Sequence, residues 1–163
     1  MPEPGPILVI CTANICRSPM AEGLLAHALS GQSGALKGLK VISAGVAARP
    51  GEPVSENSVY ALKKVGIDIS KHRARALTQQ MLDEALAVFV MTQGHRMAIE
   101  LQASPVPKEL HLFRGFMPPA GAKEIGDPFG GPIKIYEQSR DEMVEAIPSV
   151  VAYLKTLVEA RTA

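Results

Sequence analysis

The sequence predicts an α/β fold, with a doubly wound sheet of four parallel strands and helices on both faces. Short apolar runs rich in β-branched residues alternate along the chain with helical patterns, which is typical of parallel strands joined by crossover helices. The chain has 163 residues, of which 47% are hydrophobic and 20% charged, and this fits one domain with its own core. We therefore expect a single domain over residues 1–163.

The first strand is expected at Ile7-Leu8-Val9-Ile10, where every position is apolar. Such a run is typical of a strand buried on both faces, as in a parallel sheet. Three later runs with the same character predict the other strands, at residues 40–44, 86–91 and 110–113.

Helices are expected where apolar residues recur every three or four positions. These segments cover residues 18–29, 55–65, 93–101 and 132–160, and we expect the last to be broken or kinked at Pro148. Residues 115–131 are rich in glycine and proline and predict a long loop, which in a compact domain is often functional.

Composition argues against several classes of partner. The net charge of +1 argues against a nucleic-acid binder that relies on bulk positive charge, and the absence of Trp argues against base stacking. The apolar runs are far shorter than the roughly 20 residues that a membrane span needs. The first six residues do not resemble a secretory signal, so we expect a cytoplasmic protein.

The cysteines and histidines do not predict a metal or cofactor site. Only two cysteines are present, both near residue 11, so a secreted disulfide scaffold is not expected. Two thiols alone make a poor zinc site, and the four histidines show no ligand spacing (His27, His72, His95 and His111). We expect no metal and no cofactor.

The segment that follows the first strand carries chemistry. Cys11 and Arg17 are separated by five residues between a strand and a helix, so the loop can curl its backbone N–H groups around one anion. Arg17 can add a two-pronged contact to phosphate oxygens, and the positive surroundings favour the thiolate of Cys11. Ser18 can donate a hydrogen bond to that thiolate. The expected phosphate-binding residues are Thr12, Ala13, Asn14, Ile15, Cys16, Arg17 and Ser18.

The alternative is that Cys11 is a buried, inert core cysteine at the end of a strand. The spacing to Arg17, the adjacent Ser18 and the strand-to-helix context favour a nucleophile instead. Neither a Walker-type run nor a Gly-x-Gly-x-x-Gly motif is present, so no nucleotide-binding motif competes with this interpretation.

Residues 9–22, which end Cys16-Arg17-Ser18-Pro19-Met20-Ala21-Glu22, resemble the active-site signature of the low-molecular-weight protein tyrosine phosphatases. Asp127-Pro128-Phe129-Gly130-Gly131 resembles the second signature of that family, and Ser43-Ala44-Gly45 and His72-Arg73-Ala74-Arg75 resemble its intermediate landmarks in the right order. The resemblance implies hydrolysis of a phosphorylated protein substrate through a phosphocysteine on Cys11. We expect a monomer, with a weak dimer as the alternative.

Asp127 aligns with the general acid of that family. It would protonate the departing oxygen and then activate the water that hydrolyses the phosphocysteine. The alternative is an ordinary turn, since Asp-Pro followed by two glycines is favoured in turns.

Asn14, Ser43 and His72 match positions that hydrogen-bond to one another beneath the loop in the family, so we expect them to support Cys11. The alternative for His72 is a solvated histidine beside Arg73 and Arg75. Ala13 departs from the glycine that the family usually has there, and we expect a small backbone strain in an intact loop.

Cys16 has two interpretations. It either packs in the core or forms a reversible disulfide with Cys11 under oxidation, which would protect the nucleophile.

Substrate choice is expected to depend on Ile15, Ala48, Arg49 and Phe129 in the pocket walls. Asp-Pro-Phe-Gly-Gly and the sequence after it resemble a bacterial subgroup that includes protein arginine phosphatases, which tends to carry Thr at the position of Ile15. Because Ile15 offers an apolar edge that suits an aryl ring, we predict phosphotyrosine, with phosphoarginine as the alternative. A thiol-coupled arsenate reductase is less favoured, because it needs further cysteines that the chain lacks.

Overall fold

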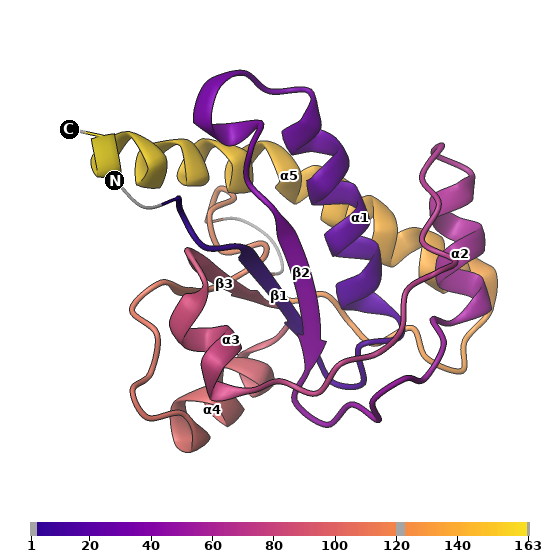
Figure 1. Cartoon of the computed structure of the whole chain (residues 1–163). Coiled ribbons are helices and arrows are strands. Elements are labelled where there is room, and N and C mark those ends of the chain that lie inside the picture. Colours follow the sequence, from indigo (N-terminus) through magenta and orange to yellow (C-terminus); the bar gives the residue numbers. More distant parts are fainter. Residues whose placement is uncertain (1–2, 120–122, 163) are drawn as a thin grey trace.

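The computed structural model describes residues 3–119 and 123–162 (Figure 1). Its centre is a sheet of four parallel strands: β1 (Ile7–Cys11), β2 (Val41–Gly45), β3 (Ala87–Val90) and β4 (Leu110–Leu112). The strands are arranged in the order β2-β1-β3-β4. The predicted α/β class and parallel sheet are confirmed.

Helices cover both faces of the sheet, as predicted. α1 (Arg17–Ser30), α2 (Glu56–Lys63) and α5 (Ile133–Thr162) lie on one side, and α3 (Gln79–Glu84) and α4 (Gln93–Gln102) on the other (Figure 1). The side chains of β1 contribute to the core on both faces of the sheet, because successive side chains of a strand point to opposite faces. Ile7 and Val9 pack in the cluster with α1 and α5, whereas Leu8 and Ile10 pack in the cluster with α3 and α4.

The structure corrects the sequence prediction in two places. Helix α5 is continuous across Pro148, where a break or kink was expected. Its buried stripe, which includes Ala146, Val150 and Leu154, packs into the core on both sides of the proline and supports an unbroken helix there. Helix α3 was not predicted, because its six residues are too few to show a stripe; Thr78 caps it by accepting the N–H of Met81.

The order of the strands places a crevice at the carboxyl end of β1. The chain leaves β1 for β2 on one side and later returns to β3 on the other, and ligands of such sheets bind where this reversal occurs. Cys11 is the last residue of β1. Gly45, at the corresponding end of β2, lies so close to the next loop that a Cβ there would come within 2.5 Å of the Thr12 carbonyl oxygen.

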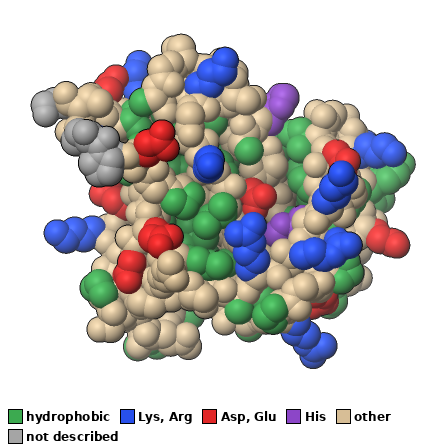
Figure 2. Space-filling model, in the orientation of Figure 1, with side chains coloured by type: hydrophobic (Ala, Val, Ile, Leu, Met, Phe, Trp, Pro, Cys, Tyr) green, Lys and Arg blue, Asp and Glu red, His purple; other side chains and the backbone are tan. Residues whose placement is uncertain are grey.

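Surface charge is mixed in sign. On the face shown in Figure 2, acidic and basic side chains are interspersed. Among the described residues, no helix combines the length and hydropathy required to cross a membrane.

Candidate active site

The loop between β1 and α1 bends at every residue from Thr12 to Cys16. Asn14 has a φ of 59°, which is the left-handed region that Asn tolerates better than most residues. Ala13 does not have a positive φ, so its backbone conformation gives no reason for the small strain expected there. The first turn of α1 has no acidic residue and no side-chain cap, so its N–H groups are available to an anion.

The side chain of Asn14 is buried, and its hydrogen bonds have one consistent direction. The backbone N–H of Arg75 donates to Asn14 Oδ1 over 2.9 Å. This contact fixes the amide, because a backbone N–H can only donate. Asn14 Nδ2 must then face the two serines, and it donates to Ser18 Oγ at 2.7 Å and to Ser43 Oγ at 2.9 Å.

The direction of donation from Asn14 determines the direction of the hydrogen bonds at both ends of this network. Ser43 donates its hydroxyl hydrogen to Glu22 Oε1 at 2.6 Å, and an ionised carboxylate can only accept. Ser18, whose oxygen already accepts from Asn14, lies 3.0 Å from Cys11 Sγ. When Cys11 is a thiolate, which can only accept, the hydroxyl of Ser18 donates to the sulfur. A donor aimed at Cys11 stabilises negative charge on the sulfur, which is the form that attacks as a nucleophile.

His72 contacts the loop from below. Its Nε2 lies 2.9 Å from the carbonyl oxygen of Asn14, and this carbonyl requires that Nε2 carry the hydrogen. The structure thus brings Asn14, Ser43 and His72 together beneath Cys11. Arg73 instead bonds the carbonyl of His72 at an exposed position.

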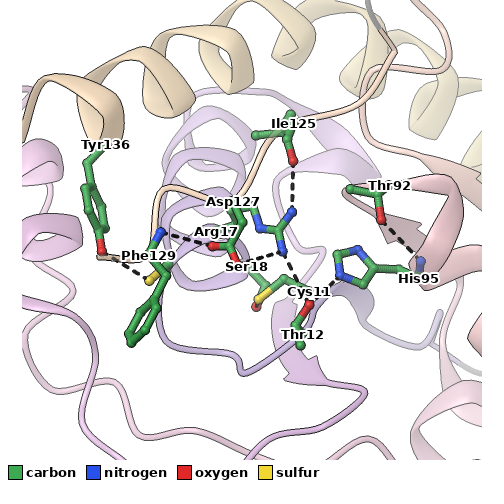
Figure 3. A network of polar contacts seen from close by, with 11 residues as sticks. Cys11, Thr12, Arg17, Ser18, Thr92, His95, Ile125, Asp127, Phe129 and Tyr136 are labelled. Atoms are coloured by element: carbon green, nitrogen blue, oxygen red, sulfur yellow. Dashed lines mark hydrogen bonds and ion pairs between the residues drawn. The ribbon is translucent and has the colours of Figure 1, made fainter. Parts of the chain in front are cut away.

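Arg17 and Asp127 lie side by side above Cys11 (Figure 3). The Arg17 guanidinium is buried, and its Nη1 donates to the Ile125 carbonyl over 2.9 Å. Its Nη2 lies 3.9 Å from Asp127 Oδ2, while the Asp127 side chain is 55% exposed. Asp127 Oδ1 also accepts from the N–H of Phe129 at 3.1 Å, so Asp127 both forms the expected turn and faces Arg17.

A cavity of about 380 Å³ opens over the loop, and Cys11, Arg17 and Asp127 all line it. Ile15 and Arg49 form parts of its wall, and Phe129, 68% exposed, lies at its rim. Ala48 was expected in this wall, but it packs against the core instead. Its neighbour Ala47 lines the cavity. Glu52, which was not predicted as a site residue, lines the same cavity. Nothing in the local sequence distinguishes Glu52 from other loop carboxylates.

A larger cavity of about 750 Å³ lies behind the loop. Its lining includes Glu22, His72 and Arg73 and contains no thiol. Both cysteine thiols therefore line the smaller cavity and not the larger one.

Cys16 is buried at the end of the loop, and both cysteines are free thiols. Its sulfur lies 3.6 Å from the hydroxyl of Tyr136, which also accepts a hydrogen bond from Ser55. Burial raises the pKa of the Cys16 thiol, against the opposing effect of the Tyr136 hydrogen bond. Cys16 is thus held as a neutral thiol at neutral pH.

His95 is a second residue that the sequence analysis missed. It lies in the first turn of α4, and its Nε2 is 2.9 Å from Thr12 Oγ1 (Figure 3). The available signal was its position, since Thr92 caps a helix directly after β3 and so places His95 at the carboxyl edge of the sheet. Among the residues that the structure describes, no three His, Cys, Asp or Glu side chains gather as a metal site would require.

The fold and this cavity define a class of protein: an α/β protein with a cysteine at the end of its first strand, facing a cavity over the loop that leads to the first helix. The family model of the low molecular weight phosphotyrosine protein phosphatases matches residues 6–160, and the chain belongs to this family. It is accordingly a phosphatase and a hydrolase.

Relatives in this family carry two different substrate names. The chain is 36% identical to a protein-arginine-phosphatase of Geobacillus stearothermophilus, over 94% of this chain and 98% of the relative. It is 35% identical to a probable low molecular weight protein-tyrosine-phosphatase, EpsP, of Ralstonia solanacearum, over 93% of this chain and 97% of the relative.

Solved structures show the same division. The YwlE arginine phosphatase of G. stearothermophilus superposes with a TM-score of 0.82 at 35% identity and covers 94% of each chain. A low molecular weight protein tyrosine phosphatase of T. tengcongensis superposes with a TM-score of 0.83 at 32% identity, over 91% of this chain and 99% of the other.

Proposed function

We propose that this chain hydrolyses protein phosphotyrosine through a phosphocysteine on Cys11, with Asp127 as the general acid. The observation that carries the proposal is that the sulfur of Cys11 receives the Ser18 hydroxyl at the base of a cavity that Arg17 and Asp127 also line. Nucleophile, anion-binding cation and acid thus meet at one site.

The reaction has two steps. The thiolate of Cys11 attacks the phosphorus, the bond to the aryl oxygen breaks, and protonated Asp127 gives its proton to that oxygen. Asp127, now a carboxylate, takes a proton from a water molecule, whose oxygen attacks the phosphocysteine. The P–S bond breaks, and the products are inorganic phosphate and the Cys11 thiolate. In both steps Arg17 and the N–H groups of the loop bind the phosphoryl oxygens.

Apolar groups in the cavity wall favour the aryl substrate. Ile15 presents an apolar edge, and the exposed ring of Phe129 at the rim can pack against a phenyl group. Phosphoarginine is the second candidate, because Glu52 offers a carboxylate in the same wall, which could accept hydrogen bonds from a guanidinium. The names of the relatives support both candidates.

Side-by-side kinetics on phosphotyrosine and phosphoarginine peptides test the proposal. We expect a higher kcat/KM for phosphotyrosine, no loss on adding EDTA, and no turnover by Cys11→Ser. Ile15→Thr should move the ratio towards phosphoarginine, whereas Glu52→Gln should move it the other way. A wild-type preference for phosphoarginine would overturn the substrate assignment, and turnover by Cys11→Ser would overturn the mechanism.

A further inference from the structure

His95 is a buried histidine that the two-step mechanism does not use. It is 5% exposed, and its Nδ1 has no hydrogen-bond partner among the described residues. Its Nε2 lies 2.9 Å from Thr12 Oγ1, and Thr12 itself lines the active-site cavity. The histidine thus contacts the site through one hydroxyl group.

The direction of this hydrogen bond follows from the unpartnered nitrogen. If Nε2 accepted from Thr12, the hydrogen of the neutral ring would lie on Nδ1 as a buried donor without a partner, which is rare in proteins. If Nε2 carries the hydrogen, Nδ1 retains only an unfilled lone pair. The ring therefore donates from Nε2 to Thr12 Oγ1. Burial, and secondarily the nearby Arg17, lower the pKa of His95 to about 4, so the ring is neutral at neutral pH.

Thr12 receives a second donor from the catalytic cation. Arg17 Nη2 lies 3.4 Å from Thr12 Oγ1, and a guanidinium can only donate. The two lone pairs of the Thr12 oxygen are then occupied by His95 and Arg17. The hydroxyl hydrogen of Thr12 therefore remains available for donation. Thr12 is exposed at the cavity, where a phosphoryl group would bind.

We propose that His95 is a positioning residue for phosphoryl transfer, which acts through Thr12. It holds the Thr12 oxygen as an acceptor for Arg17 and turns the hydroxyl hydrogen of Thr12 towards the bound phosphoryl group. Arg17 is thereby fixed on two sides, by the Ile125 carbonyl and by Thr12. The inference rests on the proposed phosphatase mechanism but not on the choice between phosphotyrosine and phosphoarginine.

A double-mutant cycle with para-nitrophenyl phosphate tests the coupling. We expect His95→Leu and Thr12→Val each to lower kcat/KM about tenfold, less than the loss of a principal oxyanion donor because Arg17 and the N–H groups of the loop still bind the phosphoryl oxygens. The double variant should also lose about tenfold, since either substitution already breaks the same connection. His95→Gln and Thr12→Ser, which keep a donor and a hydroxyl, should recover most of the activity. The exposed His27→Gln is the matched control.

Losses that multiply to about a hundredfold in the double variant would show that the residues act independently and would overturn the proposal. An unchanged His95→Leu enzyme would overturn it as well. Inhibition by vanadate gives a second measurement: the inhibition constant should rise in both single variants while the thermal midpoint of His95→Gln stays near that of the wild type. A His95→Leu effect that appears only in the thermal midpoint contradicts a positioning role.

Nitrogen NMR of the His95 ring tests the hydrogen bond to Thr12 independently of the phosphatase mechanism. We expect hydrogen on Nε2 and none on Nδ1 at pH 7, and the opposite tautomer would overturn the hydrogen-bond direction. If the wild-type protein did not turn over an aryl phosphate at all, the proposed function would fail, whereas the NMR result would still report on the Thr12 contact.

Discussion

The side-chain amide of Asn14 donates a hydrogen bond of 2.7 Å to the hydroxyl of Ser18. The backbone N–H of Arg75 donates to Asn14 Oδ1, and this contact prevents the side-chain amide from flipping. The hydrogen of Ser18 is therefore free to be donated to Cys11, as a thiolate there requires. A buried neutral amide thus sets the polarity of the hydrogen bond that reaches the nucleophile.

Asn14→Asp tests this polarity with little change in shape. A carboxylate can accept from Arg75 but cannot donate to Ser18, so the Ser18 hydrogen would turn to residue 14 and away from Cys11. Asp also tolerates the left-handed backbone that residue 14 requires. We expect kcat to fall on the order of a hundredfold, comparable to the loss of a direct oxyanion donor. The measurement is steady-state kinetics together with the alkylation rate of Cys11 by iodoacetamide.

Ser43→Ala is the matched control for this variant. It removes one acceptor of the Asn14 amide but leaves the bond to Ser18, so a loss of about tenfold or less is expected. Equal losses in both variants would mean that the direction of the Ser18 hydrogen bond has no special part in activating Cys11.

Asp127→Ala should slow turnover in a way that depends on the leaving group. A poor leaving group needs the proton more, so the loss should be about 10² to 10⁴-fold for phenyl phosphate and smaller for para-nitrophenyl phosphate. The measurement is kcat for a series of aryl phosphates with different phenol acidities. An unchanged dependence on the leaving group would assign Asp127 to the turn alone, in keeping with its bond to the Phe129 N–H.

The sequence predicted the fold well because its signals are local. The four apolar runs fall on the four strands, and the main helices begin and end within a residue or two of their predicted bounds. Continuity across Pro148 was not predictable, because it depends on tertiary packing of Ala146 and Val150 against the rest of the core. Helix α3 was missed because one cap at Thr78 is a weaker signal than an apolar stripe.

Spacing alone predicted the site only where its residues share a short segment, and the distant residues Ser43, His72 and Asp127 were assigned through the family resemblance. Cys11, Arg17 and Ser18 belong to one loop, and the structure brings Asn14, Ser43, His72 and Asp127 to it. His95 and Glu52 were not assigned from the sequence, because His95 contacts the site only through Thr12 and Glu52 enters the cavity wall from the loop after β2. Ala47 and Ala48 show the same limit, since a shift by one residue moves a side chain from the core to the cavity wall.

Cys16→Ser tests whether the second thiol protects the first. Hydrogen peroxide oxidises the Cys11 thiolate to a sulfenic acid, and the Cys16 thiol can then displace water from it to form a disulfide. Because burial raises the pKa of Cys16, peroxide should attack Cys11 first. We expect dithiothreitol to restore most of the activity of the peroxide-treated wild type and little of that of the variant. Equal recovery in both would leave Cys16 as a packing residue beside Tyr136.

His95 should make the stability of the fold depend on pH. Its pKa is about 4 in the folded chain against an ordinary value of 6.5, so the unfolded chain binds a proton first as the pH falls. Stability is therefore lost as the pH falls from 6.5 towards 4, by about 2 kcal/mol between pH 7 and pH 5. Urea denaturation at these two pH values measures the loss. In His95→Gln, which cannot titrate, the drop should be smaller by that amount, whereas in the exposed control His27→Gln it should match the wild type. An equal drop in all three proteins would show that the ring of His95 is not held neutral by the fold.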